Sequence, residues 1–246
     1  MLDMQLKASD NTTDDVPART PHKPRDLGPS EIADKLYTAI LEHRIPPGTK
    51  LAEGRLATIF SVNRARIREV LARLAHDLVV ELVPHQGAYV AKPTVQDARD
   101  VFEARRLIEP FTVRKLITTL TDRTKTQLQQ HLAREEEARR RHDQPSIIRL
   151  SGEFHVLLAE LVENSALLRT TRELSTQTCL IISLYSASTT LSCRADEHAC
   201  IVHAITEKDE KSAVELIVRH LDHIQESLAL DPVDTEVDLE ALFTQD

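Results

Sequence analysis

Apolar and polar residues follow a helical spacing over most of the chain, starting near residue 30. Apolar positions three and four residues apart predict a first helix over 30–44, with Ser30 as its N-cap. The same pattern predicts a short helix over 53–60 and a third helix over 63–76, with Asn63 as its N-cap. These three helices lie within fifty residues and are joined by short turns, which indicates a small, tightly packed unit.

Strand-like alternation follows directly after the third helix. Val79–Val83 and Ala88–Ala91 are short β-type runs, and the four residues between them place Gly87 at the tip of a hairpin. The order helix, short helix, turn, helix, hairpin is that of a winged helix-turn-helix. In such a unit the third helix can enter the major groove of DNA, which is about 12 Å wide.

The rest of the chain, after Pro93, has helical periodicity. It predicts six helices over 95–119, 123–142, 146–163, 166–190, 195–206 and 210–228. We therefore expect a mainly α fold, with an N-terminal winged helix-turn-helix followed by an all-α antiparallel bundle. The expected divisions are a flexible arm (1–28), the winged helix (29–92), the helical domain (93–230) and an acidic tail (231–246).

Composition narrows the class of protein. Apolar residues make up 41% of the 246 residues, which favours a globular protein over a disordered one. No apolar run reaches the roughly 20 residues that a membrane span needs, and the polar N-terminus has no apolar signal core. We expect a cytoplasmic protein, without a membrane partner, whose three cysteines are reduced thiols.

The charge is divided unevenly along the chain, whose net charge is −8. Residues 28–92 hold nine Lys/Arg and seven Asp/Glu and are therefore basic, at +2. Residues 93–246 hold eighteen against twenty-seven and carry −9. DNA binding requires a basic face rather than a basic protein, so the acidic total does not exclude it.

Arginines gather at the start of the third helix. Arg64 and Arg68 are four residues apart and share one face, whereas Arg66 lies toward a flank. An arginine here can donate two hydrogen bonds to guanine or bind a phosphate. At the hairpin, His85 offers a donor, and Gly87 allows close approach to the DNA. The alternative is that these arginines only form a solvent-exposed helix face without a binding role. The Gly-tipped hairpin directly after the helix favours DNA binding.

The segment IPPGTKLAEGRLATIFSVNRARIREVLARLAHDLVVELVPHQGAYV resembles the winged-helix domain of the GntR family of bacterial regulators over its whole length. The resemblance implies that Arg55, Arg64, Arg68 and Gly87 contact operator DNA. The chain departs from the family pattern in three places. These are Ser61 in place of a glycine, Asn63 in place of a serine, and Ala65-Arg66 in place of Thr-Pro. Arg66 therefore adds a cation that is unusual for the family, and we expect a different operator preference.

Three later stretches resemble the FCD domain of the FadR-like GntR subfamily: FEARRLIEP, GEFHVLLAELVEN and EHACIVHAITEKDEKSAVELIVRHL. The resemblance implies a helical bundle with a central cavity, in which many members hold a divalent metal. Its ligand histidines correspond to His155, His198 and His220, and its aspartate position is occupied by Ser151. Imidazole suits zinc, nickel, copper or iron, and three ligands leave positions open for water or an effector. The alternative is that these histidines are ordinary buried residues.

Arg105 corresponds to a cavity arginine of the same subfamily. A guanidinium in a cavity favours carboxylate effectors because it donates two parallel hydrogen bonds. Its alternative role is an ion pair with Glu109, one helical turn away. Asn164 is interpreted as a helix C-cap. The remaining histidines receive no assigned role, with His203 and His223 expected to be exposed: His22, His43, His76, His131, His142, His203 and His223.

These features favour a homodimeric transcription regulator, a repressor that a small carboxylate controls and that binds palindromic operator DNA. One alternative is a metal-dependent hydrolase with a three-histidine site. The sequence has no HExxH motif to support this alternative, and Glu153 falls on the opposite side of the helix from His155. Another alternative is a helical interaction module that does not bind DNA. We therefore predict no enzymatic activity.

Overall fold

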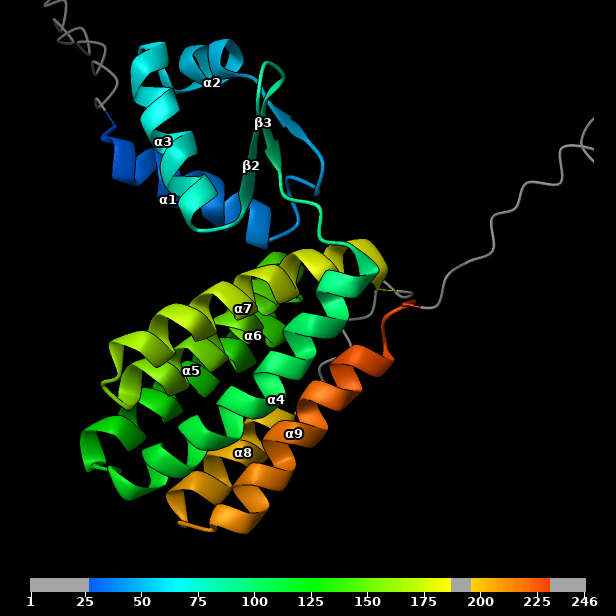
Figure 1. Cartoon of the computed structure of the whole chain (residues 1–246). Helices are drawn as coiled ribbons and strands as arrows, with labels where there is room; N and C mark the ends of the chain where they lie inside the picture. The colour runs from blue at the N-terminus through cyan, green and yellow to red at the C-terminus, as the bar shows by residue number, and fades with distance from the viewer. Residues whose placement is uncertain (1–26, 187–195, 231–246) are drawn as a thin grey trace, which may run out of the picture.

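The protein consists of a small α/β unit stacked on the end of a larger helical bundle (Figure 1). The computed structural model describes residues 27–186 and 196–230. This arrangement confirms the predicted mainly α fold, with a winged helix-turn-helix followed by an all-α bundle. Among the described residues, no helix is both long and apolar enough to cross a membrane.

The N-terminal unit contains three helices and a three-stranded antiparallel sheet. Its elements are α1 (Pro29–Leu41), β1 (Lys50–Leu51), α2 (Glu53–Phe60), α3 (Arg64–His76), β2 (Val80–Val83) and β3 (Gly87–Val90). The predicted hairpin is β2 and β3, with Val80 opposite Val90 and Val83 opposite Gly87. The sequence did not predict β1, which is only two residues long and pairs with the other edge of β3.

The helix starts of this unit agree only partly with the sequence. Asn63 caps α3 as predicted, because its Oδ1 accepts a hydrogen bond from the Arg66 amide at 2.8 Å. The prediction that Ser30 caps the first helix is wrong. Gly28 is the N-cap, and its amide donates to the Glu31 carboxylate at 2.9 Å. A proline at the first helical position, Pro29, has no amide hydrogen to satisfy, so a helix start there is favourable.

In the part of the chain that the structure describes, the C-terminal bundle has six helices, whose buried apolar residues form separate clusters. The helices are α4 (Val95–Thr118), α5 (Asp122–Arg140), α6 (Gln144–Leu161), α7 (Ser165–Tyr185), α8 (Glu197–Thr206) and α9 (Glu210–Glu226). Each begins and ends within a few residues of its prediction except α7, which stops at Tyr185 rather than 190. Residues 187–190 lie outside the described part of the chain.

Asn164 has a different role from the one predicted. Helix α6 ends with Val162 as its C-cap, and Asn164 is instead the N-cap of α7. Its Oδ1 accepts hydrogen bonds from the amides of Ala166 and Leu167 at 3.1 and 3.2 Å. Asparagine suits both helix ends, so composition alone could not decide between them.

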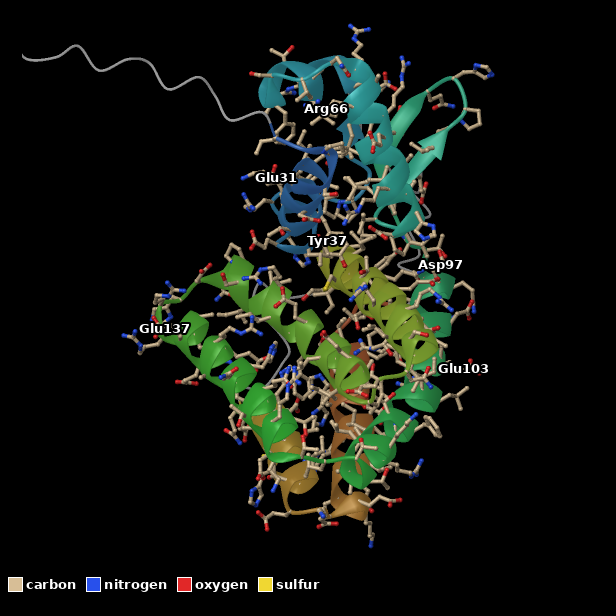
Figure 2. All side chains as sticks on the ribbon, turned by 90° about the vertical axis from the view of Figure 1, so that its left-hand side faces the viewer. Glu31, Tyr37, Arg66, Asp97, Glu103 and Glu137 are labelled. Carbon is tan, nitrogen blue, oxygen red and sulfur yellow. The ribbon has the colours of Figure 1, made fainter. Side chains whose placement is uncertain are left out.

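Helix α1 of the N-terminal unit packs against α6 and α7 of the bundle. Figure 2 shows Tyr37 at this junction, where its hydroxyl hydrogen-bonds Thr176 on α7 at 2.7 Å. His43 hydrogen-bonds the Cys179 carbonyl at 2.9 Å. Cys179 and Leu180 belong to the same hydrophobic cluster as the winged-helix core. The C-terminal half of α1 and the turn after it are therefore anchored on α7.

Candidate metal and effector site, and the DNA-binding face

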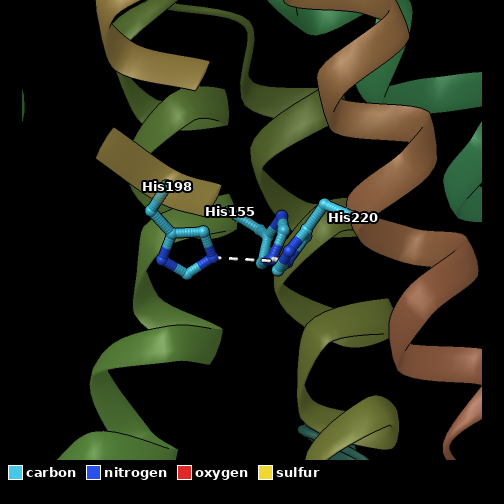
Figure 3. Close-up of side chains that lie close together, drawn as sticks. All are labelled: His155, His198 and His220. Atoms are coloured by element: carbon cyan, nitrogen blue, oxygen red, sulfur yellow. Dashed lines mark hydrogen bonds between the residues drawn. The ribbon is translucent and has the colours of Figure 1, made fainter. Parts of the chain in front are cut away.

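Three buried imidazoles converge in the middle of the bundle. His155 comes from α6, His198 from α8 and His220 from α9, and each ring is at most 2% exposed. The Nε2 atom of His220 lies 3.2 Å from that of His198 and 3.3 Å from that of His155 (Figure 3). The structure thus brings together the three histidines that the sequence singled out, from segments up to 65 residues apart.

Each imidazole hydrogen-bonds a glutamate through its Nδ1 atom. The Nδ1 atom of His155 lies 2.8 Å from Glu109, and that of His198 lies 2.8 Å from Glu135. The Nδ1 atom of His220 lies 2.7 Å from Glu197. An ionised carboxylate only accepts hydrogen bonds, so each Nδ1 carries the proton and donates it. The lone pair of every ring is then on Nε2, the atom that faces the other rings. This tautomer is the one that a metal-binding histidine adopts.

The spacing and surroundings of the histidines fit a metal ion. One ligand atom from each histidine lies within 4.8 Å of the others. Two nitrogens bound to tetrahedral zinc at the usual bond length would be about 3.3 Å apart. The Nε2 atom of His220 lies at nearly this distance from the other two Nε2 atoms. The three carboxylates behind the rings also supply negative charge that balances a divalent ion. The donor set of nitrogen ligands suits zinc, nickel and related transition metals.

Burial and charge set the protonation of the first His–Glu pair. Burial lowers the pKa of His155 to about 3, although Glu109 acts in the opposite direction. Burial on its own would raise the pKa of Glu109, but Arg105 and His155 outweigh it and bring the pKa down to about 2. At neutral pH the pair is therefore a neutral imidazole and a carboxylate, which is the state that metal binding requires.

Arg105 joins this site from α4 and forms the ion pair with Glu109 that was weighed from the sequence, whereas its role in binding an effector stays a prediction. Its Nε donates to Glu109 at 2.6 Å, and its Nη1 donates to Thr178 on α7 at 3.0 Å. The third nitrogen, Nη2, is buried and has no hydrogen-bond partner among the described residues. Arg105, His155 and Ser151 line a small cavity of about 30 Å³. A buried guanidinium nitrogen beside a cavity is a donor suited to an anion.

The predicted DNA-contacting arginines lie on the outer side of the winged helix. Arg55, Arg64 and Arg68 are all exposed. Arg68 pairs with Glu53 of α2 at 2.9 Å, and the guanidinium of Arg64 lies across Gly54. Because a side chain at position 54 would approach the Arg64 guanidinium to 3.1 Å, the glycine makes room for it.

Arg66 lies apart from these three. Its Nη1 donates to the Leu27 carbonyl at 3.3 Å, and the side chain is only partly exposed. At the wing, His85 and Gly87 are exposed and both have positive φ, at 61° and 103°. The DNA-binding roles of all the residues singled out from the sequence stay predictions: Arg55, Arg64, Arg66, Arg68, His85 and Gly87.

The sequence did not identify the carboxylates that hold two of the rings. Glu135 lies on α5 and Glu197 on α8, and neither belongs to a recognisable motif with its histidine. Two histidines without an assigned role also lie here. His131 is buried, with Nε2 3.1 Å from the Leu150 carbonyl and 3.3 Å from Glu135. His223 is half-buried rather than exposed as predicted, because its Nδ1 pairs with Glu197 at 2.5 Å.

Comparison with protein families gives two matches that together span most of the described chain. Residues 29–90 match the bacterial regulatory proteins of the gntR family, and residues 100–223 match the FCD domain. The first segment is the winged-helix unit, and the second holds Arg105 and the three histidines.

Several curated proteins are similar to this chain. The HTH-type transcriptional repressor RspR of Escherichia coli K12 is 25% identical over 185 residues, which cover 75% of this chain and 81% of RspR. The Nta operon transcriptional regulator of Aminobacter aminovorans is 27% identical over 76% of this chain and 89% of its own length. The gluconate operon transcriptional repressor of Bacillus licheniformis is 33% identical, over 39% of this chain and 40% of its own.

Solved structures share the fold. A GntR transcriptional regulator from Rhodococcus sp. RHA1 superposes with a TM-score of 0.72 at 20% identity, covering 80% of this chain and 95% of the other. Escherichia coli McbR/YncC gives a TM-score of 0.70 at 17% identity, covering 79% and 93%. At these identities the likeness concerns the arrangement of the helices and the small sheet.

Proposed function

The chain belongs to the GntR family of bacterial regulatory proteins and carries an FCD domain, and from this premise we propose that it is a metal-dependent, carboxylate-responsive repressor of the cytoplasm. The prediction that it is a regulator and not an enzyme is confirmed by the family, and the hydrolase alternative has no support among the relatives.

The observation that carries the proposal is the carboxylate behind each of the three converging histidines. An ordinary buried histidine needs only hydrogen-bond partners for its own ring, whereas here the Nε2 atoms of His155 and His198 both lie close to that of His220, at 3.3 and 3.2 Å. His155, His198 and His220 would hold the ion, which when bound supplies a Lewis acid with positions open for an effector oxygen. Arg105 would bind the effector's carboxylate through its unpartnered Nη2.

The metal is tested on protein purified without a histidine tag. Elemental analysis of the wild type is expected to give close to one transition-metal ion per chain, and His155→Ala to lose most of it. Because Phe154 packs edge-on against the His155 ring, with centroids 5.4 Å apart, the variant's fold is checked by circular dichroism. Substoichiometric metal that is unchanged in His155→Ala would reject the site.

The DNA-binding half is tested by changing Arg64 and Arg68 to alanine. If these side chains contact bases, each change costs about 1–3 kcal/mol of operator binding and relaxes specificity. The matched control is Arg114→Ala, an exposed arginine on α4 of the bundle, paired with Glu210 at 3.3 Å. Operator affinity equal to wild type in the Arg64/Arg68 double variant would contradict the assignment.

We propose a homodimer because α4 presents apolar side chains that nothing in the described chain covers. Leu107 is 73% exposed and Phe111 is 52% exposed, and they are one turn apart on the same face. Adjacent exposed apolar residues of this size are typical of protein–protein contacts. A two-fold dimer would present two α3 helices to the two halves of a palindromic operator.

A further inference from the structure

Two cavities lie next to each other in the protein, the larger one partly open to solvent, and the residues that line both form the wall between them. The smaller one, of about 30 Å³, lies beside Arg105 and His155. The larger one, of about 320 Å³, lies at the junction between α1 of the winged helix and α5, α6 and α7 of the bundle. Three residues line both cavities: Gly152, Ser175 and Cys179.

The smaller cavity has room for little more than a carboxylate. A water needs roughly 10–15 Å³ by this kind of measure, so 30 Å³ holds about two water-sized groups. The two oxygens of a carboxylate are of that size, but a carbon skeleton is not accommodated. Binding sites for small molecules commonly measure about 300–1,000 Å³, which is the size of the neighbouring cavity.

The wall between the two cavities is made of small residues. Gly152 contributes no side chain, and a Cβ there would lie 3.0 Å from the Cys179 sulfur, so glycine leaves room for that thiol. The Ser175 hydroxyl is buried and has no hydrogen-bond partner among the described residues. Ser175 and Cys179 thus place only short side chains between the two spaces.

Apolar and charged side chains both line the larger cavity, and the charged ones include Arg134, Arg149 and Arg172. Leu41 and the Tyr37 ring come from the winged helix, and Val156 and Leu157 from α6. Resting on the carboxylate site proposed above, we infer that the effector is a carboxylate with an apolar body of several carbons. Its carboxylate binds at Arg105, and its body passes the wall into the junction, where it contacts α1 directly.

This placement explains how a bundle ligand reaches the DNA-binding unit. Tyr37 lines the junction cavity and also hydrogen-bonds Thr176, so an occupant of the cavity competes for the space beside that bond. Thr178, two residues further along α7, holds Arg105. An occupant of both cavities would therefore contact Arg105 in the bundle and Tyr37 in the winged helix. These two residues bind Thr178 and Thr176, which lie two residues apart on α7.

The test uses the full-length, metal-loaded protein and the straight-chain series acetate, butyrate, hexanoate and octanoate, measured by calorimetry. Each methylene buried in the junction should tighten binding about fourfold. The variant Val156→Trp fills the junction cavity and should abolish the advantage of the longer members over acetate. Val156→Phe is a smaller plug that serves if the tryptophan variant does not fold.

The matched control is Ile147→Trp, at a half-buried α6 position that lines neither cavity; it should keep the advantage of the longer chains. Binding of acetate with no gain from added methylenes would overturn the inference while leaving the carboxylate site standing. An equal gain in wild type and both Val156 variants would overturn it as well. Failure of every acid to bind metal-loaded protein would overturn the carboxylate site itself, and this inference with it.

Discussion

Replacing Glu135 by glutamine isolates the contribution of one carboxylate to the histidine cluster. Glu135 is 3% exposed, and its Oε1 accepts the Nδ1 proton of His198 at 2.8 Å. Burial alone would raise the pKa of Glu135, but hydrogen bonds from His131 and His198 outweigh it and lower the pKa to about 2. The side chain is therefore charged in the native protein. Glutamine keeps the shape and an acceptor oxygen but removes the negative charge.

Loss of that charge should weaken metal binding while leaving the ligand nitrogens in place. Removing such a partner of a metal-binding histidine typically costs 10- to 100-fold in affinity. This corresponds to about 1.4–2.7 kcal/mol. We expect the lower half of the range, because the amide oxygen can still accept from His198 and only the electrostatic part is lost.

The assay is competition for zinc between apoprotein and a chromophoric chelator at neutral pH. The matched control is Glu137→Gln, which removes the same charge two residues along α5, on a side chain that is 44% exposed. It should bind zinc within twofold of the wild type. Equal affinities for wild type, Glu135→Gln and Glu137→Gln would refute the reasoning, since the buried carboxylate would then contribute nothing to the site.

Three further outcomes are expected. Asn63→Ala removes the cap of α3 and should lower the free energy of unfolding by about 1 kcal/mol, measured by urea denaturation. Changing both Leu107 and Phe111 to glutamate should shift sedimentation from dimer toward monomer, whereas Leu82→Glu, at a wing residue 54% exposed, should not; a dimer of unchanged strength would exclude the α4 face. The pKa of Glu109 is lowered from 4.5 to about 2, so its stabilising charge is complete above pH 4.5 and is lost as the pH falls toward 2. The stability difference between apo wild type and apo Glu109→Gln should therefore be constant from pH 5 to 7 and shrink below pH 4.5; a difference that grows on acidification would show that the sign is wrong.

Helical periodicity was sufficient to predict the helices of the described residues, because each helix buries one apolar stripe that recurs along the sequence. It could not predict β1, since two residues contain no period, and it could not assign Asn164 to the helix that follows it. Such decisions depend on where the chain goes next rather than on local composition.

The histidines of the site were identified through resemblance, but their carboxylate partners were not. Glu109 was considered only as a partner of Arg105, whereas it also holds His155 from 46 residues away. Glu135 lies 63 residues from His198 in the chain. Contacts over such separations exist only after the bundle forms, so no local pattern marks them. The same holds for the junction cavity, whose walls come from both units.

The packing of Cys179 and Leu180 in the winged-helix core has a consequence for modular exchange among regulators of this architecture. A cut at the end of β3 separates the domains in sequence but divides a shared hydrophobic core. A chimera that joins this winged helix to a foreign bundle would leave the inner face of α1 without the α7 side chains that cover it. Transplanting the DNA-binding unit therefore requires the matching surface of α7 to be moved with it, so the unit of recombination is larger than the unit of DNA recognition.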